Sequence, residues 1–481
     1  MAELGRCWLG LDVGTSSIKG LLVDAGGHVH ARADAAYGTE FGHRGEAEQD
    51  PRDYLRAARE VIAACRTTEV ALGGIGLVGQ TPTLVLCDEA GEPVRPALTW
   101  QDTRAEAEAR ELASTLGPSE PLVGLDLPWA PSFPPARLLW LSRQEPETVR
   151  RTRWALQPKD FVGFHLTGAP ASDPWSTKGL CNVATLAPAE AVLRAAGWSA
   201  DVVPPLAAAW TAAGVVSARA ASALGLPAGT PVSTGWSDAL AGMLAVGAFD
   251  EPAGFVLSGT SSIVGLSARA AGRADGSLLV IPSTCAPLPV VYGPTQSSGA
   301  SVRWLADLLG VDVRDVLALA ADADADAEPL LFVPYLGGER APVWRTDVRG
   351  ALLGLSARHG AAELAAAVIA GVCLSERHVL ASAEAQAGAV APEVRVGGRG
   401  SAEEPWRSAR SAALARPLGV LAEPDASALG AAMLAAAAAN DGDLAAAGPL
   451  RGAMERVEAA GSAGADAYER YLRGSGVCLA W

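Results

Sequence analysis

LGLDVGTSSIKGLLVD (residues 9–24) and GFVLSGTSSIVGLSAR (residues 254–269) share the pentapeptide GTSSI, which therefore occurs once in each half of a 481-residue chain. Each copy follows an apolar run that predicts a buried strand. Glycine lets the backbone turn and approach a ligand closely, and the hydroxyl and N–H groups that follow it point outward as donors. A turn of this kind suits phosphate. A plain β-turn uses the same residues, but two copies at equivalent places suggest a duplicated hairpin that binds phosphates from two sides.

The two copies differ in one informative position. Asp12 lies two residues before the glycine of the first copy, and Leu257 occupies the matching position of the second. A carboxylate beside a phosphate-binding turn is well placed to hold Mg²⁺ through water. The alternative is an aspartate that only makes hydrogen bonds within the protein.

Composition narrows the class of protein. Nearly half of the residues are apolar (49%) and 19% are charged, which is typical of packed globular domains, and the length predicts two of them. The net charge of −15 argues against nucleic acid as the main partner. The 7 cysteines are scattered singly, so we expect free thiols rather than disulfides or a zinc site. No signal peptide is evident, and apolar runs such as LAAAVIAGVCL (364–374) are too short to span a bilayer, which predicts a soluble cytoplasmic protein.

The order of predicted elements indicates an α/β protein. The first forty residues predict three strands joined by turns, followed by a helix over 50–65 and a buried strand over 70–80. The glycines of GIGLVG (74–79) match the GxGxxG spacing but lie inside the apolar run, so they do not predict a dinucleotide-binding turn. Two Ala-rich helices are expected at 361–387 and 402–415, and the tail from 440 to 481 is predicted to be a helix with a short terminal extension.

Several further motifs, in order along the chain, make the sequence resemble the FGGY family of carbohydrate kinases, with the xylulokinase-like branch as the best match. The resemblance covers about 430 residues and rests, beside the two GTSS turns, on these segments: GQTP (79–82), WQDTR (100–104), FPPARLLWL (133–141), PKD (158–160), SDPWSTKG (172–179), GWSDALAG (235–242), PYLGGERAP (334–342), GALLGLSARHGAAEL (350–364), GGRGSAEEPW (397–406) and EPDASALGAAMLA (423–435).

The resemblance implies a fold and a reaction. The fold is α/β, with two actin-like (ribonuclease H-like) domains related by duplication, expected at 1–247 and 248–481, and a cleft for ATP and sugar between them. The reaction is ATP-dependent phosphorylation of a sugar or polyol hydroxyl, most simply that of a ketopentose such as D-xylulose. ATP and Mg²⁺ are the implied cofactors. Members of the family are often dimers, so the resemblance also allows a homodimer.

Roles carry over to matching residues of this chain. Asp238 is implied as the general base and Asp12 as the residue facing Mg²⁺. The phosphates are assigned to two sets of residues: Gly14, Thr15, Ser16 and Ser17 on the γ side, and Gly259, Thr260 and Ser261 on the α/β side. Gly397 and Gly398 would admit adenine. On the acceptor side the resemblance implies Gln80, Thr81, Asp102 and Arg104, and Lys19 is a further candidate for a phosphate contact.

Plainer interpretations stand beside some of these roles. Asp238 precedes a predicted helix, where aspartate is a common N-cap, and Asp102 with Arg104 matches a simple surface ion pair. The tight turn that glycines allow between a strand and a helix is compatible with Gly397 and Gly398 near adenine. An actin-fold chaperone or regulator, or a non-catalytic ATP binder, are the alternatives to a kinase. Intact Asp12 and Asp238 favour the kinase.

The chain departs from the xylulokinase pattern at four places. Thr81-Pro82 stands where Met-His is usual, and Ala239 follows Asp238 where Asn is common. Both changes remove polar groups that would contact the sugar, so an acceptor other than D-xylulose, such as ribulose, gluconate, glycerol or erythritol, stays open. Ala370 replaces a usual acidic residue, and one extra residue precedes Trp406.

Overall fold

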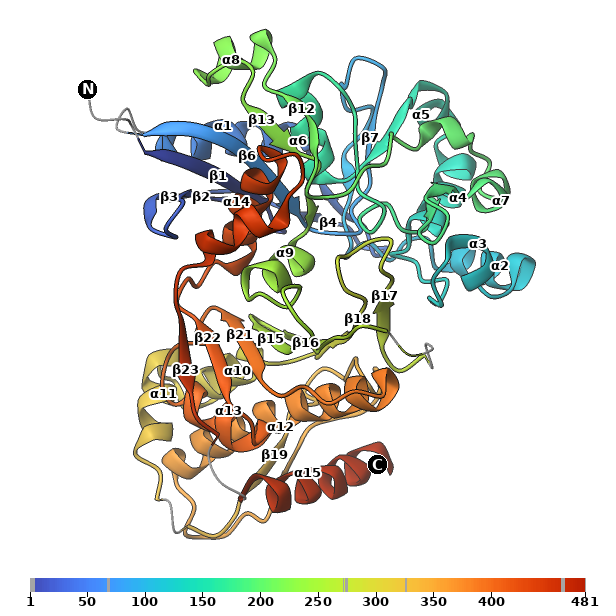
Figure 1. Cartoon of the computed structure of the whole chain (residues 1–481). Coiled ribbons are helices and arrows are strands. Elements are labelled where there is room, and N and C mark those ends of the chain that lie inside the picture. Colours follow the sequence, from blue (N-terminus) through green and yellow to red (C-terminus); the bar gives the residue numbers. More distant parts are fainter. Residues whose placement is uncertain are drawn as a thin grey trace. The chain divides into compact units, whose positions relative to one another are not determined.

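The computed structural model describes residues 5–66, 70–270, 272, 276–324, 327–459 and 463–480. It divides into two compact units, each with its own sheet. Unit 1 comprises Met1–Ala245, Pro282–Cys285 and Ser427–Gly452, and unit 2 comprises Val246–Ile281, Ala286–Ala426 and Ala453–Trp481. Residues Ser427–Gly452, although late in the sequence, therefore pack with the first unit, which differs from the expected contiguous division into 1–247 and 248–481 (Figure 1).

Unit 1 is built on a seven-stranded sheet with helices on it. Its strands, in sheet order, are β12 (Ala212–Val215), β13 (Pro231–Ser233), β6 (Ala71–Gly79), β1 (Arg6–Val13), β2 (Ser17–Asp24) and β3 (Val29–Ala36), with β14 (Trp236–Ser237) also pairing with β6. The helices of this unit outside the insertion described below are α1 (Pro51–Cys65), α6 (Pro158–Thr167), α8 (Ala218–Leu224), α9 (Asp238–Ala245), α14 (Ala426–Ala438) and the 3-10 helix η2 (Leu444–Arg451). The predicted opening of three strands, the helix after them and the next buried strand are confirmed.

Unit 2 repeats this topology. Its sheet order is β17 (Leu279–Ile281), β18 (Val290–Pro294), β16 (Ser262–Ser267), β15 (Gly254–Ser258), β21 (Val394–Gly398), β22 (Leu418–Leu421) and β23 (Met454–Val457). In both units a three-stranded antiparallel meander is followed across the sheet by two parallel strands and an antiparallel edge strand. The repeated order confirms the predicted duplication.

The two GTSSI segments form the turns between equivalent strands, β1–β2 and β15–β16. In unit 1 the last strand pair before the turn is Val13 with Ile18, and in unit 2 it is Ser258 with Ser262. The turn therefore spans Gly14–Ser17 in unit 1 and Gly259–Ser261 in unit 2. Identical residues thus form hairpins that differ by one position in register.

Glycines let α14 lie very close to the sheet of unit 1. Gly10 and Gly76 are direct partners in the pairing of β1 with β6. A Cβ atom on Gly10 would lie 2.1 Å from the backbone oxygen of Ala428, and one on Gly76 would lie 1.7 Å from that of Ala431. The glycines with the GxGxxG spacing at 74–79 therefore lie in a strand, where they leave room for the backbone of α14. They do not form a dinucleotide-binding turn, as the sequence predicts.

This contact makes a stability prediction. Gly76→Ala should destabilise unit 1 by about 1–3 kcal/mol, because the added methyl group meets backbone atoms that a side-chain rotation cannot move. Gly38→Ala is the matched control, since a Cβ there has no neighbour within 4 Å. Thermal unfolding of both variants would show it. Equal unfolding temperatures for the two variants would mean that α14 does not pack as closely as described.

An insertion in unit 1 carries helices with a separate apolar core. Its helices are α2 (Glu106–Leu116), α3 (Glu120–Val123), α4 (Pro134–Gln144), α5 (Pro146–Arg151), α7 (Glu190–Ala195) and η1 (Ala200–Val202). Its core contains Leu86, Leu112 and Leu138. Unit 1 also contains three small sheets: β4 (Glu40–Phe41) with β5 (Ala47–Gln49) and β8 (Ala97–Leu98), β7 (Val85–Cys87) with β9 (Trp154–Leu156), and β10 (Cys181–Asn182) with β11 (Ala187–Pro188).

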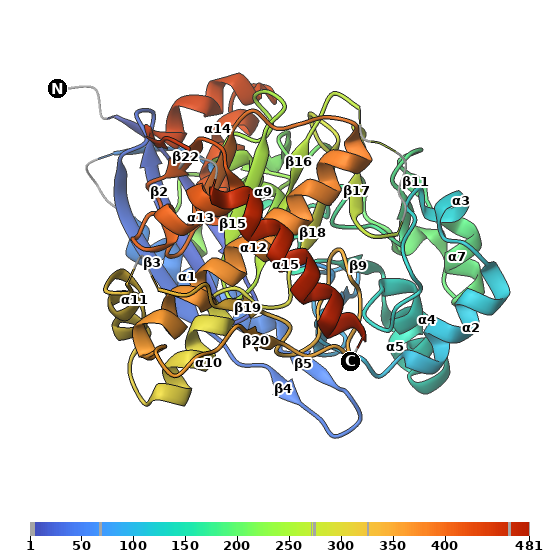
Figure 2. The same cartoon turned by 90° about the horizontal axis from the view of Figure 1, so that it is seen from below.

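The helices of unit 2 surround α12 (Ala361–Ala387), which has the predicted bounds. The others are α10 (Gly299–Leu309), α11 (Val313–Ala321), α13 (Trp406–Leu414) and α15 (Ala463–Ala480), and the short strands β19 (Leu331–Val333) and β20 (Ala351–Leu353) pair with each other. Helix α15 packs across α12 (Figure 2). The sequence predicts a helix with a short terminal extension for the tail, but Met454–Val457 form β23, because they complete the sheet edge beside β22.

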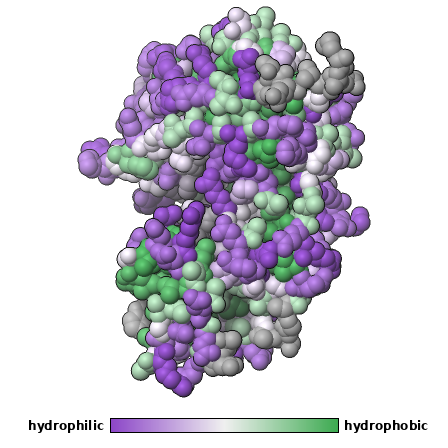
Figure 3. All heavy atoms as spheres, turned by 90° about the vertical axis from the view of Figure 1, so that its left-hand side faces the viewer, coloured by the Kyte–Doolittle hydropathy of each residue, from purple (hydrophilic) through white to green (hydrophobic). Residues whose placement is uncertain are grey.

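Helix α12 extends on both sides of the apolar run at 364–374 that it contains. Among the described helices it alone has the length and apolarity of a membrane span, but 67% of its most apolar stretch is buried inside the protein. The face of the molecule in Figure 3 mixes many hydrophilic residues with smaller hydrophobic areas. Burial of this kind is what a core helix of a globular unit shows.

Candidate functional site

Strand register brings Asp12 and Asp238 to the same edge of the unit 1 sheet. Asp12 pairs with Val78 of β6, and Trp236 of β14 pairs with the same Val78 from the other side. Asp238 follows Ser237 directly and is the first residue of α9, as predicted. Lys19 stands opposite Asp12 in the β1–β2 pairing, so the two side chains share one face of the hairpin.

The charges around Asp238 control its protonation. Burial and, to a smaller extent, the Asp12 carboxylate raise the pKa of Asp238 to about 7, although the N–H of Ala239 and the Lys178 ammonium act in the opposite direction. The Ala239 N–H donates to Asp238 Oδ1 over 2.7 Å. Burial lowers the pKa of Lys178 to about 8, against the attraction of Asp173 and Asp238. A carboxylate with a pKa near neutrality is suited to accept a proton at physiological pH.

A buried lysine fixes the segment that leads to Asp238. Lys159 is fully buried, and its Nζ lies 2.5 Å from Asp160 Oδ1, 3.1 Å from Asp173 Oδ1 and 3.2 Å from the Thr234 carbonyl oxygen. Thr234 is four residues before Asp238. Lys159 therefore joins α6 to the backbone that positions the carboxylate. The sequence marked PKD only as a family motif and did not reveal this role.

The first hairpin leaves donors available for an anion. Gly14 N–H donates to the Ser17 carbonyl oxygen, and the N–H groups of Thr15 and Ser16 donate to no other group among the described residues. Tyr37 supports the turn from below by donating to the Gly14 carbonyl oxygen over 2.5 Å. Exposed N–H groups on a turn form a concavity that binds anions.

Gln80 lies behind this hairpin. It is 2% exposed, and its Nε2 donates to Gln49 Oε1 over 2.9 Å. Gln49 in turn donates to the Thr15 carbonyl oxygen over 2.7 Å. Gln80 therefore supports the hairpin through Gln49, and its expected contact with the acceptor stays a prediction. Thr81, the next residue, is half-buried.

Trp100 is a residue that the sequence interpretation missed. It is 41% exposed, and its Nε1 donates to Thr15 Oγ1 over 3.1 Å, which sets an open indole face beside the first hairpin. The WQDTR motif contained the only signal, an aromatic residue next to predicted site residues. An exposed tryptophan held at its polar end is suited to contact the apolar face of a sugar ring.

Asp102 and Arg104 form a buried brace, so the interpretation as a surface ion pair is wrong. Asp102 is fully buried and accepts from the Ala47 N–H over 2.9 Å and from Arg104 Nη2 over 2.7 Å. Arg104 also lies 2.6 Å from Glu48 and stacks over Trp140. The pair fixes the segment after Trp100.

The second hairpin docks on the N-terminus of α10. The N–H groups of Ser298 and Ala300 donate to the Thr260 carbonyl oxygen, and that of Gly299 donates to the Gly259 carbonyl oxygen, over 3.0–3.1 Å. A Cβ atom on Gly299 would lie 2.8 Å from the Gly259 oxygen, so glycine permits this approach. Because the carbonyl groups face α10, the Thr260 and Ser261 N–H groups face away from it, and they have no backbone partner among the described residues.

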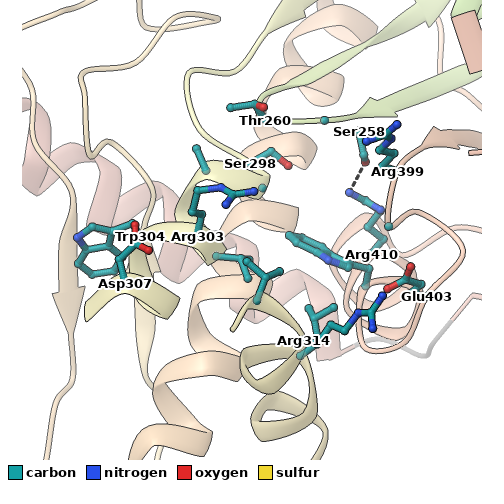
Figure 4. A pocket seen from close by; sticks show the side chains of 18 residues that line it. Ser258, Thr260, Ser298, Arg303, Trp304, Asp307, Arg314, Arg399, Glu403 and Arg410 are labelled. Atoms are coloured by element: carbon teal, nitrogen blue, oxygen red, sulfur yellow. Dashed lines mark hydrogen bonds between the residues drawn. The ribbon is translucent and has the colours of Figure 1, made fainter. Parts of the chain in front are cut away.

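A cavity of about 850 Å³ opens beside the second hairpin, within unit 2. Figure 4 shows its polar wall: Ser258 and Thr260 from the hairpin, Arg303, Trp304 and Asp307 from α10, Arg314 from α11, Arg399 and Glu403 from the loop after β21, and Arg410 from α13. Its volume suits a nucleotide-sized ligand. The basic side chains outnumber the acidic ones in a chain of net charge −15, which favours an anion.

Gly397 and Gly398 lie in β21 beside β15, next to the cavity but not in its wall. Gly398 has φ +96°, and a Cβ on it would lie 2.2 Å from the Ser258 carbonyl oxygen. A Cβ on Gly397 would lie 2.6 Å from the Val246 side chain. Both glycines therefore admit protein atoms, and Arg399 and Gly400 line the cavity where the sequence predicted the glycine pair.

No group of three or more His, Cys, Asp or Glu side chains that could hold a metal ion occurs within the described ranges. Asp12 and Asp238, however, place two carboxylates close enough for the charge of one to raise the pKa of the other. Mg²⁺ is typically held by one or two carboxylates together with substrate phosphates, so this pair fits such an ion.

Comparison with known proteins finds family models that match both halves of the chain. Family models for the N-terminal and C-terminal domains of the FGGY family of carbohydrate kinases match residues 7–245 and 254–439. The chain belongs to the FGGY family of carbohydrate kinases. The xylulose kinase of Escherichia coli (strain K12) is 31% identical over 90% of each chain. A solved xylulose kinase from Rhodospirillum rubrum is 27% identical, with a TM-score of 0.86 over 98% of this chain and 97% of its own.

A gluconokinase from Bacillus subtilis (strain 168) is 27% identical over 89% of this chain and 86% of its own. This FGGY chain is therefore a carbohydrate kinase with the two-domain actin-like fold, a family that uses ATP to phosphorylate sugar hydroxyls. The duplicated sheets and the predicted family are confirmed together.

Proposed function

We propose that this FGGY kinase transfers the γ-phosphoryl group of ATP to a hydroxyl of a small ketose, with D-xylulose as the leading acceptor. The observation that carries the proposal is the position of Asp238: it is half-buried at the start of α9, beside Asp12, on the same sheet edge as a hairpin with open N–H groups. The xylulose kinases among the relatives support the choice of acceptor.

The site residues take the following roles in this proposal. Asp238 accepts the proton of the attacking hydroxyl, and Lys178 keeps the Asp238 carboxylate ionised. The turn at Gly14–Ser17 binds the γ side of the nucleotide, with Lys19 close by, and the turn at Gly259–Ser261 binds the α/β side. Asp12 holds Mg²⁺, which when bound neutralises charge on the transferred phosphoryl group. The cavity of unit 2 receives the nucleoside.

The acceptor is bounded by residues of unit 1. Trp100 offers its exposed indole to the sugar, and Thr81 is the polar side chain of the GQTP segment that is partly exposed. Pro82 and Ala239 supply no side-chain donor, so hydroxyl groups that other members of the family bind there gain nothing in this chain. Ribulose, gluconate, glycerol and erythritol are therefore the alternatives to test. We place the enzyme in the cytoplasm, where ATP is supplied. We also propose that it forms a homodimer, which light scattering would test.

Coupled ADP release with Mg·ATP across these acceptors tests the proposal. One ketose should support saturable turnover that exceeds the rate without acceptor. Saturable turnover with gluconate and not with a ketose would mean that the acceptor is an aldonate, while the proposed kinase reaction would stand. If the protein binds ADP but no acceptor stimulates ADP release, the protein would be an ATP-binding regulator rather than an active kinase.

The pKa values make a prediction about pH. Asp238 must be ionised to accept a proton, so kcat/KM should fall as the pH drops below its pKa, which burial raises toward about 7. Lys178→Gln removes the cation that lowers this pKa and should shift the rising limb of the profile to higher pH. This direction holds with or without a cation at Asp12. Arg143→Gln, on the surface at 43% side-chain exposure, is the control. If the rising limb of the kcat/KM profile did not shift in Lys178→Gln, Lys178 would not control the pKa of the general base.

A further inference from the structure

Unit 2 contains a buried ion pair behind the second hairpin that the proposed roles do not use. Glu376 of α12 is 0% exposed and Arg410 of α13 is 1% exposed. Arg410 Nε donates to Glu376 Oε2 over 2.9 Å, and Arg410 Nη2 donates to Glu376 Oε1 over 3.1 Å. The contact is the bidentate arrangement that arginine makes with a carboxylate.

The pair also holds both ends of the hairpin turn. Ser262 donates to Glu376 Oε1 over 2.6 Å, and Arg410 Nη2 donates to Ser258 Oγ. Ser258 and Ser262 are the last strand pair before the turn. Figure 4 shows the hydrogen bond between Arg410 and Ser258 as a dashed line. The guanidinium group is thus fixed directly at the base of Gly259–Ser261.

One nitrogen of this guanidinium is not used by the protein. Nε and Nη2 are bound as described, but Nη1 is buried and has no hydrogen-bond partner among the residues that the structure describes. Arg410 lines the cavity, and its guanidinium carbon lies 5.0 Å from the centre of the Trp406 ring. An unsatisfied buried donor on a charged group costs free energy unless something binds it.

Stability alone gives a weak reason for this pair. Removing two charges from water is costly, and well-packed apolar residues of similar volume often replace a buried ion pair with no loss. Most buried pairs with a structural purpose also satisfy all their donors. Here the residue with the spare donor, Arg410, lines a cavity whose other cationic side chains are Arg303, Arg314 and Arg399. This placement points to an anionic ligand.

We propose that Arg410, oriented by Glu376 and Ser258, is a binding residue for the phosphates of the nucleotide, with Nη1 as the donor. The inference rests on the proposed function, because it assigns the cavity to a nucleotide. Glu376 is a positioning residue, since it acts through Arg410 and Ser262. The ligand class is a nucleoside diphosphate or triphosphate, and the contact is to phosphate oxygen rather than to the base or ribose.

The test compares ligands that differ only in phosphate. Glu376→Gln/Arg410→Met removes the guanidinium without leaving a buried charge, and the amide oxygen of the introduced glutamine can still accept from Ser262. Binding of ADP, AMP and adenosine is followed by tryptophan fluorescence, since Trp304 and Trp406 line the cavity. We expect ADP affinity to fall about 10- to 100-fold, the range for one hydrogen bond to a charged group. Adenosine affinity should change less than about 3-fold on the same reasoning.

Controls separate this contact from loss of folding. The double variant should keep the wild-type unfolding temperature and D-xylulose affinity. If the double variant does not fold, Arg410→Lys is the alternative, because it keeps a cation opposite Glu376 but loses the bidentate guanidinium contact. It should weaken ADP binding more than adenosine binding. Equal losses for ADP and adenosine, or no loss of ADP affinity in a folded variant, would overturn the inference alone. Wild-type protein that bound neither ligand would overturn the proposed function as well.

Discussion

We expect Asp238→Asn to lower kcat by about 10²- to 10⁴-fold, the usual contribution of a general base. Asparagine has nearly the same shape, and its side-chain oxygen can still accept from the Ala239 N–H, but it cannot take a proton. Turnover of the best acceptor measures the loss. ADP affinity should not change, because the cavity that we assign to the nucleotide consists of unit 2 residues.

The same substitution separates catalysis from helix capping. Asparagine and aspartate are nearly equal at helix N-termini, so a capping role would leave kcat within about 2-fold of the wild type. Asp53→Asn is the matched control, since Asp53 lies in the first turn of α1 and is 42% exposed. Full activity in Asp238→Asn would transfer the role of base to another residue.

The second large effect concerns stability. Lys159→Met should destabilise unit 1 by about 3–5 kcal/mol, because it leaves Asp160 and Asp173 buried without their cation. For a unit of this size the unfolding temperature should fall by roughly 6–20 °C. Any folded fraction should also lose kcat, since Lys159 holds the Thr234 carbonyl oxygen on the segment before Asp238.

Arg143→Met provides the comparison. Arg143 pairs with Glu111 over 2.7 Å, but both side chains are more than 40% exposed. Surface pairs of this kind contribute about 0–1 kcal/mol. Equal unfolding temperatures for Lys159→Met and Arg143→Met would show that the buried cluster is not held by the lysine charge.

Much of the fold could be predicted because its signals are local. The two GTSSI turns follow apolar strands, Pro51 begins α1 as a helix N-terminal proline should, and the bounds of α12 follow from its apolar pattern. The position of Asp238 at a strand end before a helix was equally local. The family resemblance then supplied the duplication, which the two sheet orders confirm.

Other features depend on residues far apart in the sequence. Strand β23 joins a sheet edge that only the folded unit provides, so its four residues gave no periodic signal. The contact of Gly397 and Gly398 with adenine stays a prediction, and their close approach to Val246 and Ser258 became evident only in the folded unit. Only tertiary contacts bring Trp100, Lys159 and the Glu376–Arg410 pair to the candidate site. At position 370 the sequence has alanine where the family usually has an acidic residue. The structure shows that another residue of the same helix, Glu376, is a buried carboxylate.

Transfer of label from [γ-³²P]ATP to an acceptor tests the central claim most directly. The account predicts that the wild-type enzyme forms a labelled sugar phosphate from one small ketose, and that Asp238→Asn forms it about 10²- to 10⁴-fold more slowly. Label that appears only as inorganic phosphate, or that stays in ATP with every ketose, aldonate and polyol tried, would contradict it.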